Sequence, residues 1–124
     1  NVIIHNHPVY ATGLSILQKN IKPYHYMIAF FGGNDVKCAN FALPGSKKLS
    51  EYVVKALNDR KACLLANHGS VIVGSDFDET LILTEELEVL CKQITIAKIN
   101  GTPKIVSQKN MRDVLKAIKN YGKQ

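Results

Sequence analysis

Hydrophobic residues in this chain follow two kinds of pattern, and the first consists of short continuous runs. Three such runs end at polar or turn-forming residues and predict buried β-strands: 2–4, 62–66 and 71–73. The last two runs flank the segment 67–70, and a short loop with glycine between apolar runs is typical of a hairpin. A looser alternation over 36–43 predicts an edge or connecting strand, and a further short strand is expected at 105–106.

The second kind of pattern is an apolar stripe with spacings of three and four residues, which predicts helices. Four helices are expected: at about 9–18, after Ser46, from Ser75 to about 100, and after Ser107. Serine can cap the last three, and Ser75 with Asp78 resembles a capping box. In the longest helix the stripe consists of Leu83, Leu87, Leu90, Ile94 and Ala97. Strands interspersed with helices, without a repeat or a linker-like segment, predict one mixed α/β domain over residues 1–124.

Composition and charge exclude several classes of protein. A hydrophobic content of 46% with 21% charged residues is typical of a folded domain and argues against disorder. No apolar run reaches the roughly 18–20 residues that cross a bilayer, so no membrane partner is expected. The net charge of +6 comes from dispersed lysines rather than a clustered stripe, which favours a solvated surface over nucleic-acid binding. A mild attraction for anionic metabolites remains compatible with this charge.

The three cysteines, Cys38, Cys63 and Cys91, form no CxxC pair. An odd number of cysteines scattered among apolar residues indicates a reducing compartment, with the thiols packed as small hydrophobic groups. A cytoplasmic location is therefore expected.

Three of the four histidines are placed where they can bind one metal ion. Side chains two residues apart in an extended segment point to the same side, so His5 and His7 can chelate together. A His-x-His pair alone is more often structural, but His68 sits at the hairpin tip beside Gly69, where a metal or substrate can approach the backbone. Three histidine nitrogens with open coordination are typical of a catalytic zinc site. His25 is expected to be an ordinary loop or core histidine.

Four segments resemble, in order and approximate spacing, the class II aldolase/adducin head family: "HNHPVYATGLS", "KPYHYMIAFFGG", "LPGSKKLSEYVVKAL" and "CLLANHGSVIVG". Within that family the chain is most similar to the L-fuculose-1-phosphate aldolases, in the spacing from His7 to His68 and in the ending "AIKNYGKQ". The resemblance implies a three-layer α/β/α sandwich around a mainly antiparallel central sheet. It also implies that the chain is the C-terminal part of a subunit whose N-terminal portion is missing.

The resemblance implies a zinc-dependent aldehyde-lyase that reversibly cleaves L-fuculose 1-phosphate, or a similar ketose 1-phosphate, to dihydroxyacetone phosphate and L-lactaldehyde. His5, His7 and His68 match the family's Zn²⁺ ligands, and the metal stabilises the enediolate formed on cleavage. Tyr26 matches a tyrosine that reaches a neighbouring subunit's site and donates a proton. Tyr121 matches a tail tyrosine that helps to close the site. A homotetramer with active sites at subunit interfaces is implied as well.

The chain also departs from the family pattern. Pro44 stands where the fuculose phosphate aldolases have an aromatic residue lining the aldehyde pocket. The family's acid/base glutamate and phosphate loops precede the His-x-His pair and have no counterpart here, so the isolated chain is expected to be poorly active. Two alternatives stay open: a related zinc sugar-phosphate epimerase, dehydratase or decarboxylase, and a non-catalytic association module like the adducin head. The second alternative is expected to lose the histidines that this chain has.

Overall fold

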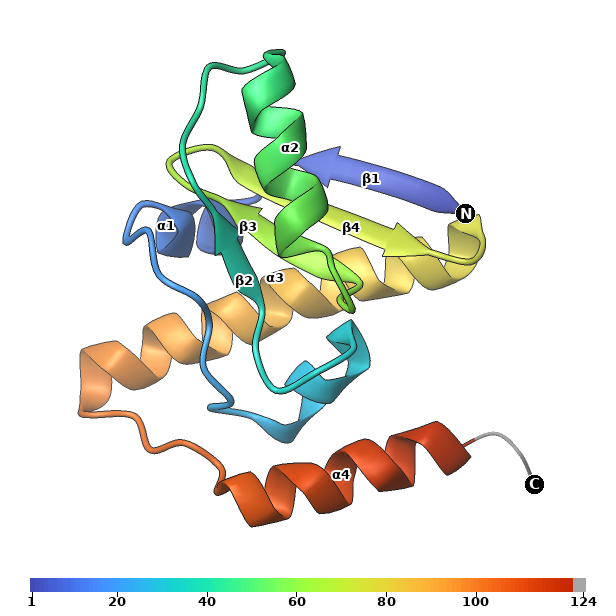
Figure 1. Ribbon diagram of the computed structural model, residues 1–124. Coiled ribbons are helices and arrows are strands. Elements are labelled where there is room, and N and C mark those ends of the chain that lie inside the picture. The colour runs from blue at the N-terminus through green and yellow to red at the C-terminus, as the bar shows by residue number, and fades with distance from the viewer. Residues whose placement is uncertain (122–124) are drawn as a thin grey trace.

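The computed structural model describes residues 1–121 of the chain (Figure 1). The strands of this part are β1 (Val2–Asn6), β2 (Lys37–Ala39), β3 (Ala62–Leu65) and β4 (Gly69–Gly74). The helices are α1 (Val9–Ser15), the 3-10 helix η1 (Tyr26–Phe31), α2 (Lys47–Ala56), α3 (Phe77–Asn100) and α4 (Gln108–Asn120). The four predicted helices and the predicted hairpin are confirmed, although α1 ends at Ser15, three residues before the expected position.

The sheet has the strand order β1-β4-β3-β2 and is mixed. The β1–β4 and β3–β4 pairs are antiparallel, whereas β2 runs parallel to β3. The expectation of a mainly antiparallel sheet is corrected at this edge. Parallel neighbours need a crossover connection, and α2 provides it between β2 and β3. The strand expected over 36–43 is also shorter, because only three residues pair with β3.

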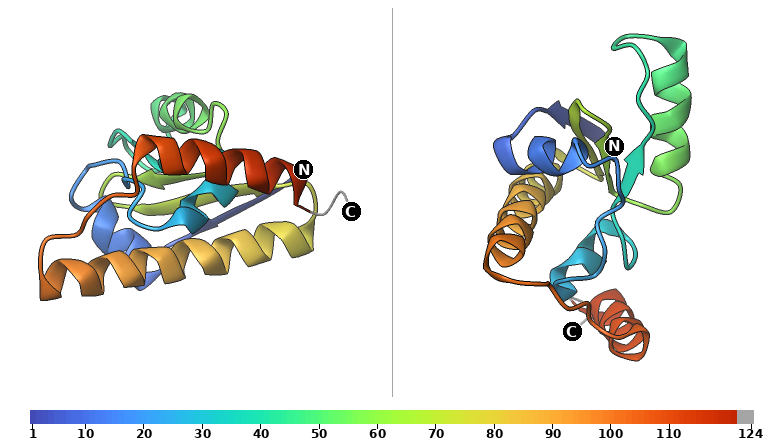
Figure 2. Two further views of the ribbon diagram at one scale, coloured as in Figure 1. Left: turned by 90° about the horizontal axis from the view of Figure 1, so that it is seen from below. Right: turned by 90° about the vertical axis from the view of Figure 1, so that its left-hand side faces the viewer.

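Helices cover both faces of the sheet, which confirms the three-layer α/β/α arrangement (Figure 2). Successive side chains of β3 point to opposite faces of the sheet and so pack against different helices. Ala62 and Leu64 face the core cluster that contains residues of α1 and α3. Cys63 and Leu65 pack instead with Ala56 and its neighbours on α2. Both interfaces are closely packed, since all four β3 side chains are buried.

The long helix α3 supplies most of the core on its side of the sheet. Leu83, Leu87, Leu90 and Ile94 are buried, as the stripe predicts. Ala97 is exposed, because the last turns of α3 extend beyond the sheet. Among the described residues, no helix is both long enough and apolar enough to span a membrane.

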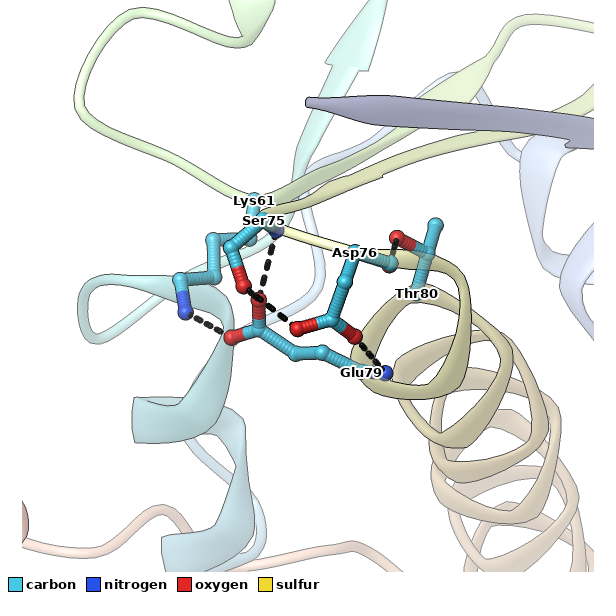
Figure 3. Close-up of polar contacts among 5 residues, drawn as sticks. All are labelled: Lys61, Ser75, Asp76, Glu79 and Thr80. Atoms are coloured by element: carbon cyan, nitrogen blue, oxygen red, sulfur yellow. Dashed lines mark hydrogen bonds and ion pairs between the residues drawn. The ribbon is translucent and has the colours of Figure 1, made fainter.

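The N-terminus of α3 is capped by Asp76 and not by Ser75, which corrects the predicted capping box by one residue (Figure 3). The Asp76 carboxylate accepts a hydrogen bond of 2.8 Å from the Glu79 N–H. The Glu79 carboxylate in turn accepts hydrogen bonds from the backbone N–H and the hydroxyl of Ser75. It also forms an ion pair with Lys61. Aspartate is as good an N-cap as serine, so the two candidates could not be separated by residue type.

The segment that follows α3 does not form the strand expected at 105–106. Val106 donates one backbone hydrogen bond of 2.8 Å to the Pro23 carbonyl. Pro23 and Pro103 have no N–H to donate, which limits regular pairing between these segments. This contact precedes α4, which packs against η1 and buries Met111.

Candidate metal centre

The end of β1 and the β3–β4 turn bring three histidines to one point. The antiparallel register pairs His5 with Val71 and Asn6 with Ser70, so the turn residue His68 faces the His5-x-His7 segment. One ligand nitrogen from each ring lies within 4.8 Å of the other two. The ring centroids are 4.8 to 4.9 Å apart. The structure therefore brings His5, His7 and His68 together, as the pattern predicts.

The backbone of the β3–β4 turn suits this approach. Asn67 has a φ of 56°, and asparagine is one of the few residues besides glycine that often adopts this left-handed conformation. A Cβ at Gly69 would lie 2.3 Å from the Asn6 carbonyl oxygen and 2.8 Å from Cδ2 of His7. Glycine is thus required at position 69 by close contact with the His5-x-His7 segment.

The His5 ring is oriented by a backbone hydrogen bond. Its Nδ1 lies 2.9 Å from the Ser70 carbonyl oxygen, and because a carbonyl only accepts, Nδ1 carries the proton. The other nitrogen, Nε2, is left for a ligand and points toward His7. Ser70 is itself fixed, since it is fully buried and its hydroxyl donates to Asn6 Oδ1 at 2.6 Å. This is the outer support that metal-binding histidines usually have.

The geometry fits a divalent metal. The two Nε2 atoms of His5 and His7 are 3.1 Å apart. With Zn–N bonds of about 2.0–2.1 Å, two nitrogens of a tetrahedral zinc site lie about 3.3 Å apart. Burial lowers the pKa of His68, and His5 and His7 lower it further, which favours the neutral imidazole that binds metals. Within residues 1–121, the cluster holds no carboxylate or thiol besides the three histidines.

The two predicted tyrosines lie elsewhere on the chain. Tyr26 and Tyr121 line one largely apolar pocket of about 470 Å³ between η1 and α4, and none of the three histidines lines it. Both side chains are exposed, Tyr26 to 52% and Tyr121 to 84%. His25 stacks on Tyr26, and its Nδ1 accepts a hydrogen bond from the Met27 N–H at the start of η1. His25 thus lies at the start of η1 and is not a member of the three-histidine cluster.

The sequence pattern does not distinguish Glu88 from the other acidic residues on helix faces. In the structure its two carboxylate oxygens accept hydrogen bonds from the N–H groups of Tyr10 and Ala11, at 2.7 and 2.8 Å. Helix α1 has Pro8 at its N-cap, with no side-chain hydrogen bond from that residue. The missing local cap at Pro8 is the one signal in the sequence that indicates a distant partner for this turn.

Comparisons with known proteins identify the family to which the chain is similar. The family model described as "Class II Aldolase and Adducin N-terminal domain" matches residues 1–95. The L-fuculose phosphate aldolase of Escherichia coli (strain K12) is 40% identical over 123 residues, which is 98% of this chain and 57% of that protein. A 5-methylthioribulose-1-phosphate/5-deoxyribulose-1-phosphate aldolase of Rhodospirillum rubrum is 35% identical over 97% of this chain and 54% of its own length.

The fold is also similar to that of a solved L-fuculose 1-phosphate aldolase. The TM-score is 0.89 at 36% sequence identity, over 94% of this chain and 55% of that structure. The chain thus spans little more than half the length of the relatives that it matches.

Proposed function

The chain belongs to the class II aldolase and adducin N-terminal domain family, and on this premise we propose that it carries the metal centre of a zinc-dependent aldolase. The whole enzyme would reversibly cleave L-fuculose 1-phosphate, or a similar ketose 1-phosphate, to dihydroxyacetone phosphate and L-lactaldehyde or a related aldehyde. The observation that carries the proposal is the convergence of His5, His7 and His68 on one point. A non-catalytic association module would not be expected to keep three histidines whose rings meet at one point.

The three histidines would hold the metal, each in the role that its surroundings favour. His5 is oriented through Nδ1 by the Ser70 carbonyl, so that Nε2 is directed at the shared point. His7 presents its own Nε2 3.1 Å from that of His5. Burial, and then His5 and His7, lower the pKa of His68, which favours its neutral, metal-binding form. Bound Zn²⁺ would supply Lewis acidity toward the oxygen atoms on which negative charge develops during retro-aldol cleavage. Three protein ligands leave coordination positions open for those oxygens.

We assign the activity to the whole subunit and propose that this chain is its C-terminal part. The chain spans 57% of the length of the Escherichia coli aldolase. Retro-aldol cleavage needs a base and an acid, and no carboxylate joins the histidine cluster within the described residues. The acid/base glutamate and the phosphate-binding loops would then come from outside residues 1–124, and the chain alone would bind metal but cleave substrate slowly.

Tyr26 and Tyr121 would act at the aldehyde end of the substrate in a neighbouring subunit. Both are exposed on one pocket, which is separate from the histidines of their own chain. In a homotetramer with active sites at subunit interfaces, these tyrosines would reach the active site of the adjacent subunit. A hydroxyl on an apolar, exposed surface can donate a proton to a neighbour's substrate once that surface is covered.

A second candidate substrate is 5-methylthioribulose 1-phosphate or 5-deoxyribulose 1-phosphate, because the Rhodospirillum rubrum relative is named as an aldolase of these sugars. Pro44 is exposed in the loop before α2, where an aromatic residue would narrow an aldehyde pocket. A smaller, rigid residue there favours an aldehyde that differs from L-lactaldehyde in size.

A cytoplasmic location is part of the proposal. All three cysteines are free thiols. Burial raises the pKa of Cys63 and of Cys91 to about 12, so both remain protonated and packed in the core at neutral pH. Such thiols suit a reducing compartment.

Product analysis tests the proposed reaction. The whole subunit is incubated with L-fuculose 1-phosphate and, separately, with 5-deoxyribulose 1-phosphate, and dihydroxyacetone phosphate is measured by a coupled reductase. We expect its release in a zinc-dependent manner, and His68→Ala should lower the rate at least about 100-fold. An epimeric ketose phosphate without cleavage would instead identify an epimerase, and no reaction with either sugar would contradict the aldolase.

A further inference from the structure

Helix α1 begins two residues after His7, and its first turn is held from across the molecule. The first N–H groups of a helix have no partner within the helix, and the N-cap side chain usually supplies one. Here the N-cap is Pro8, which makes no side-chain hydrogen bond. Glu88 of α3 supplies acceptors for two of these groups, with Oε1 2.7 Å from the Tyr10 nitrogen and Oε2 2.8 Å from the Ala11 nitrogen. The carboxylate thereby replaces a local cap.

This contact is stronger than a neutral cap and well protected. Hydrogen bonds from N–H groups to a carboxylate are charge-assisted, and the positive end of the helix dipole adds to the attraction. Glu88 is partly buried, and α1 and α3 pack closely against each other around it. Lys92, one turn further along α3, lies over the Tyr10 ring at 5.7 Å and helps to cover the same turn.

The contact reaches His7 through a stiff link. Pro8 has a φ of −73° and a ψ of 154°, and its ring prevents rotation about φ. The Thr12 N–H donates to the Pro8 carbonyl at 2.9 Å, so Pro8 is already part of the helix frame. On its other side, His7 follows Asn6, which is held in register with Ser70. The position of His7 is thus set by β1 from one side and by the Glu88-capped turn from the other.

We propose that Glu88 is a positioning residue for His7: by capping α1 from α3 it fixes where the His7 ring stands relative to His5 and His68. This inference rests on the proposed function, because it presumes that the three histidines bind a metal. Glu88 is not proposed as a ligand, since both of its oxygens are engaged with backbone N–H groups and it lies outside the ligand cluster. Its effect on the metal is exerted through the backbone of residues 7–11.

The shape of the contact predicts which replacements fail. Glutamine keeps one acceptor oxygen but turns its NH₂ group toward the second backbone N–H, so that one donor faces another. Aspartate is one methylene shorter and loses reach to both groups. Alanine removes both acceptors and leaves two N–H groups of the first turn without a partner.

The test measures metal affinity in the chain itself, with Co²⁺ as a visible probe and Zn²⁺ as its competitor. We expect Glu88→Gln to weaken Co²⁺ binding about 10-fold, with a changed visible spectrum, and Glu88→Ala to weaken it further. The matched control is Asp76→Ala, which removes the side-chain cap of α3 at the far end of that helix. It should lower stability by a similar amount and leave Co²⁺ affinity and spectrum unchanged.

The outcomes for the positioning role and for the metal centre itself can be distinguished. If Glu88→Gln binds Co²⁺ as tightly as the unmodified chain, or if Asp76→Ala weakens binding equally, the positioning role is wrong. If the unmodified chain binds no Co²⁺, or binds it equally well after His68→Ala, the metal centre itself is wrong and the inference falls with it. If Glu88→Ala fails to fold, the test rests on Glu88→Gln and on the NMR chemical shifts of the His7 ring in the metal-free protein. We expect Glu88→Gln to change these shifts.

Discussion

Gly69 lies directly against His7, so closely that a Cβ at position 69 would stand 2.8 Å from Cδ2 of the imidazole. The same Cβ would lie 2.3 Å from the Asn6 carbonyl oxygen, which is far inside van der Waals contact. The backbone of the β3–β4 turn, which carries His68, thus packs directly against the end of β1, which carries His5 and His7. There is no space for a side chain at position 69 between them. This contact determines how near His68 can come to the other two rings.

Gly69→Ala should therefore separate the hairpin from the His5-x-His7 segment. The added methyl group meets backbone, which cannot rotate away, so we expect a loss of about 1–3 kcal/mol in stability from overpacking and a marked loss of metal affinity. Thermal unfolding and Co²⁺ titration check both effects. Gly13→Ala is the control, because a Cβ at position 13 of α1 has no neighbour within 4 Å. That change should leave metal binding intact and stabilise α1 slightly.

Acid should weaken the contacts that Glu79 makes with Lys61 and Ser75 at the start of α3 (Figure 3). Hydrogen bonds from Lys61, and then those from Ser75, lower the pKa of Glu79 to about 2, from an ordinary value of 4.5. A depressed carboxyl pKa gives stability that is complete above about pH 4.5 and is lost as the pH falls toward 2. Because the side chains of Lys61 and Glu79 are 46% and 33% exposed, solvent screening reduces the contribution to about 1 kcal/mol or less.

Comparison with Glu79→Gln isolates this effect. We expect the free energy of unfolding of the unmodified chain to converge on that of the variant as the pH is lowered from 5 to 2. Glu51→Gln is the control, since Glu51 forms only an exposed ion pair of 3.9 Å with Lys48 and should not alter the pH profile. A constant gap between unmodified chain and Glu79→Gln over this range would contradict the assignment.

Mixing of inactive subunits should test whether Tyr26 serves a neighbouring site. In the whole enzyme, Tyr26→Phe should lower kcat by about 10²-fold or more and leave zinc content unchanged, because a proton donor is removed and no ligand is touched. His68→Ala should remove activity through the metal. Co-refolding of the two variants should restore part of the activity, since some sites then combine an intact metal centre with an intact Tyr26. No recovery would place Tyr26 in its own subunit's site or outside catalysis, and Tyr121→Phe can be tested in the same way.

Much of the fold could be predicted because its signals are local. The hairpin around His68 and the core stripe of α3 follow from patterns within a few residues, and both are present. The parallel pairing of β2 depends on a strand only three residues long, whose partner is set by the α2 crossover and by packing. The chain between Tyr26 and Phe31 forms a 3-10 helix, which short apolar runs do not distinguish from other structures.

The candidate site divides in the same way. His5, His7 and His68 could be identified because the strand period and the glycine-containing turn place them on one edge. Glu88 could not be identified, because its partners Tyr10 and Ala11 lie 78 and 77 positions away in the chain. A glutamate on a helix is also most simply interpreted as an exposed surface residue. The shift of the α3 cap from Ser75 to Asp76 is smaller, and it arises because two adjacent residues are equally able to accept the hydrogen bond.

The most direct test of the metal centre is the metal content of the purified chain. After dialysis against buffered Zn²⁺, elemental analysis should find close to one zinc per chain, and His5→Ala, His7→Ala and His68→Ala should each reduce it strongly. His25→Ala is the control, because His25 stacks on Tyr26 at the start of η1 and should leave the zinc content unchanged. Full zinc content in His68→Ala, or none in the unmodified chain, would contradict the three-histidine centre.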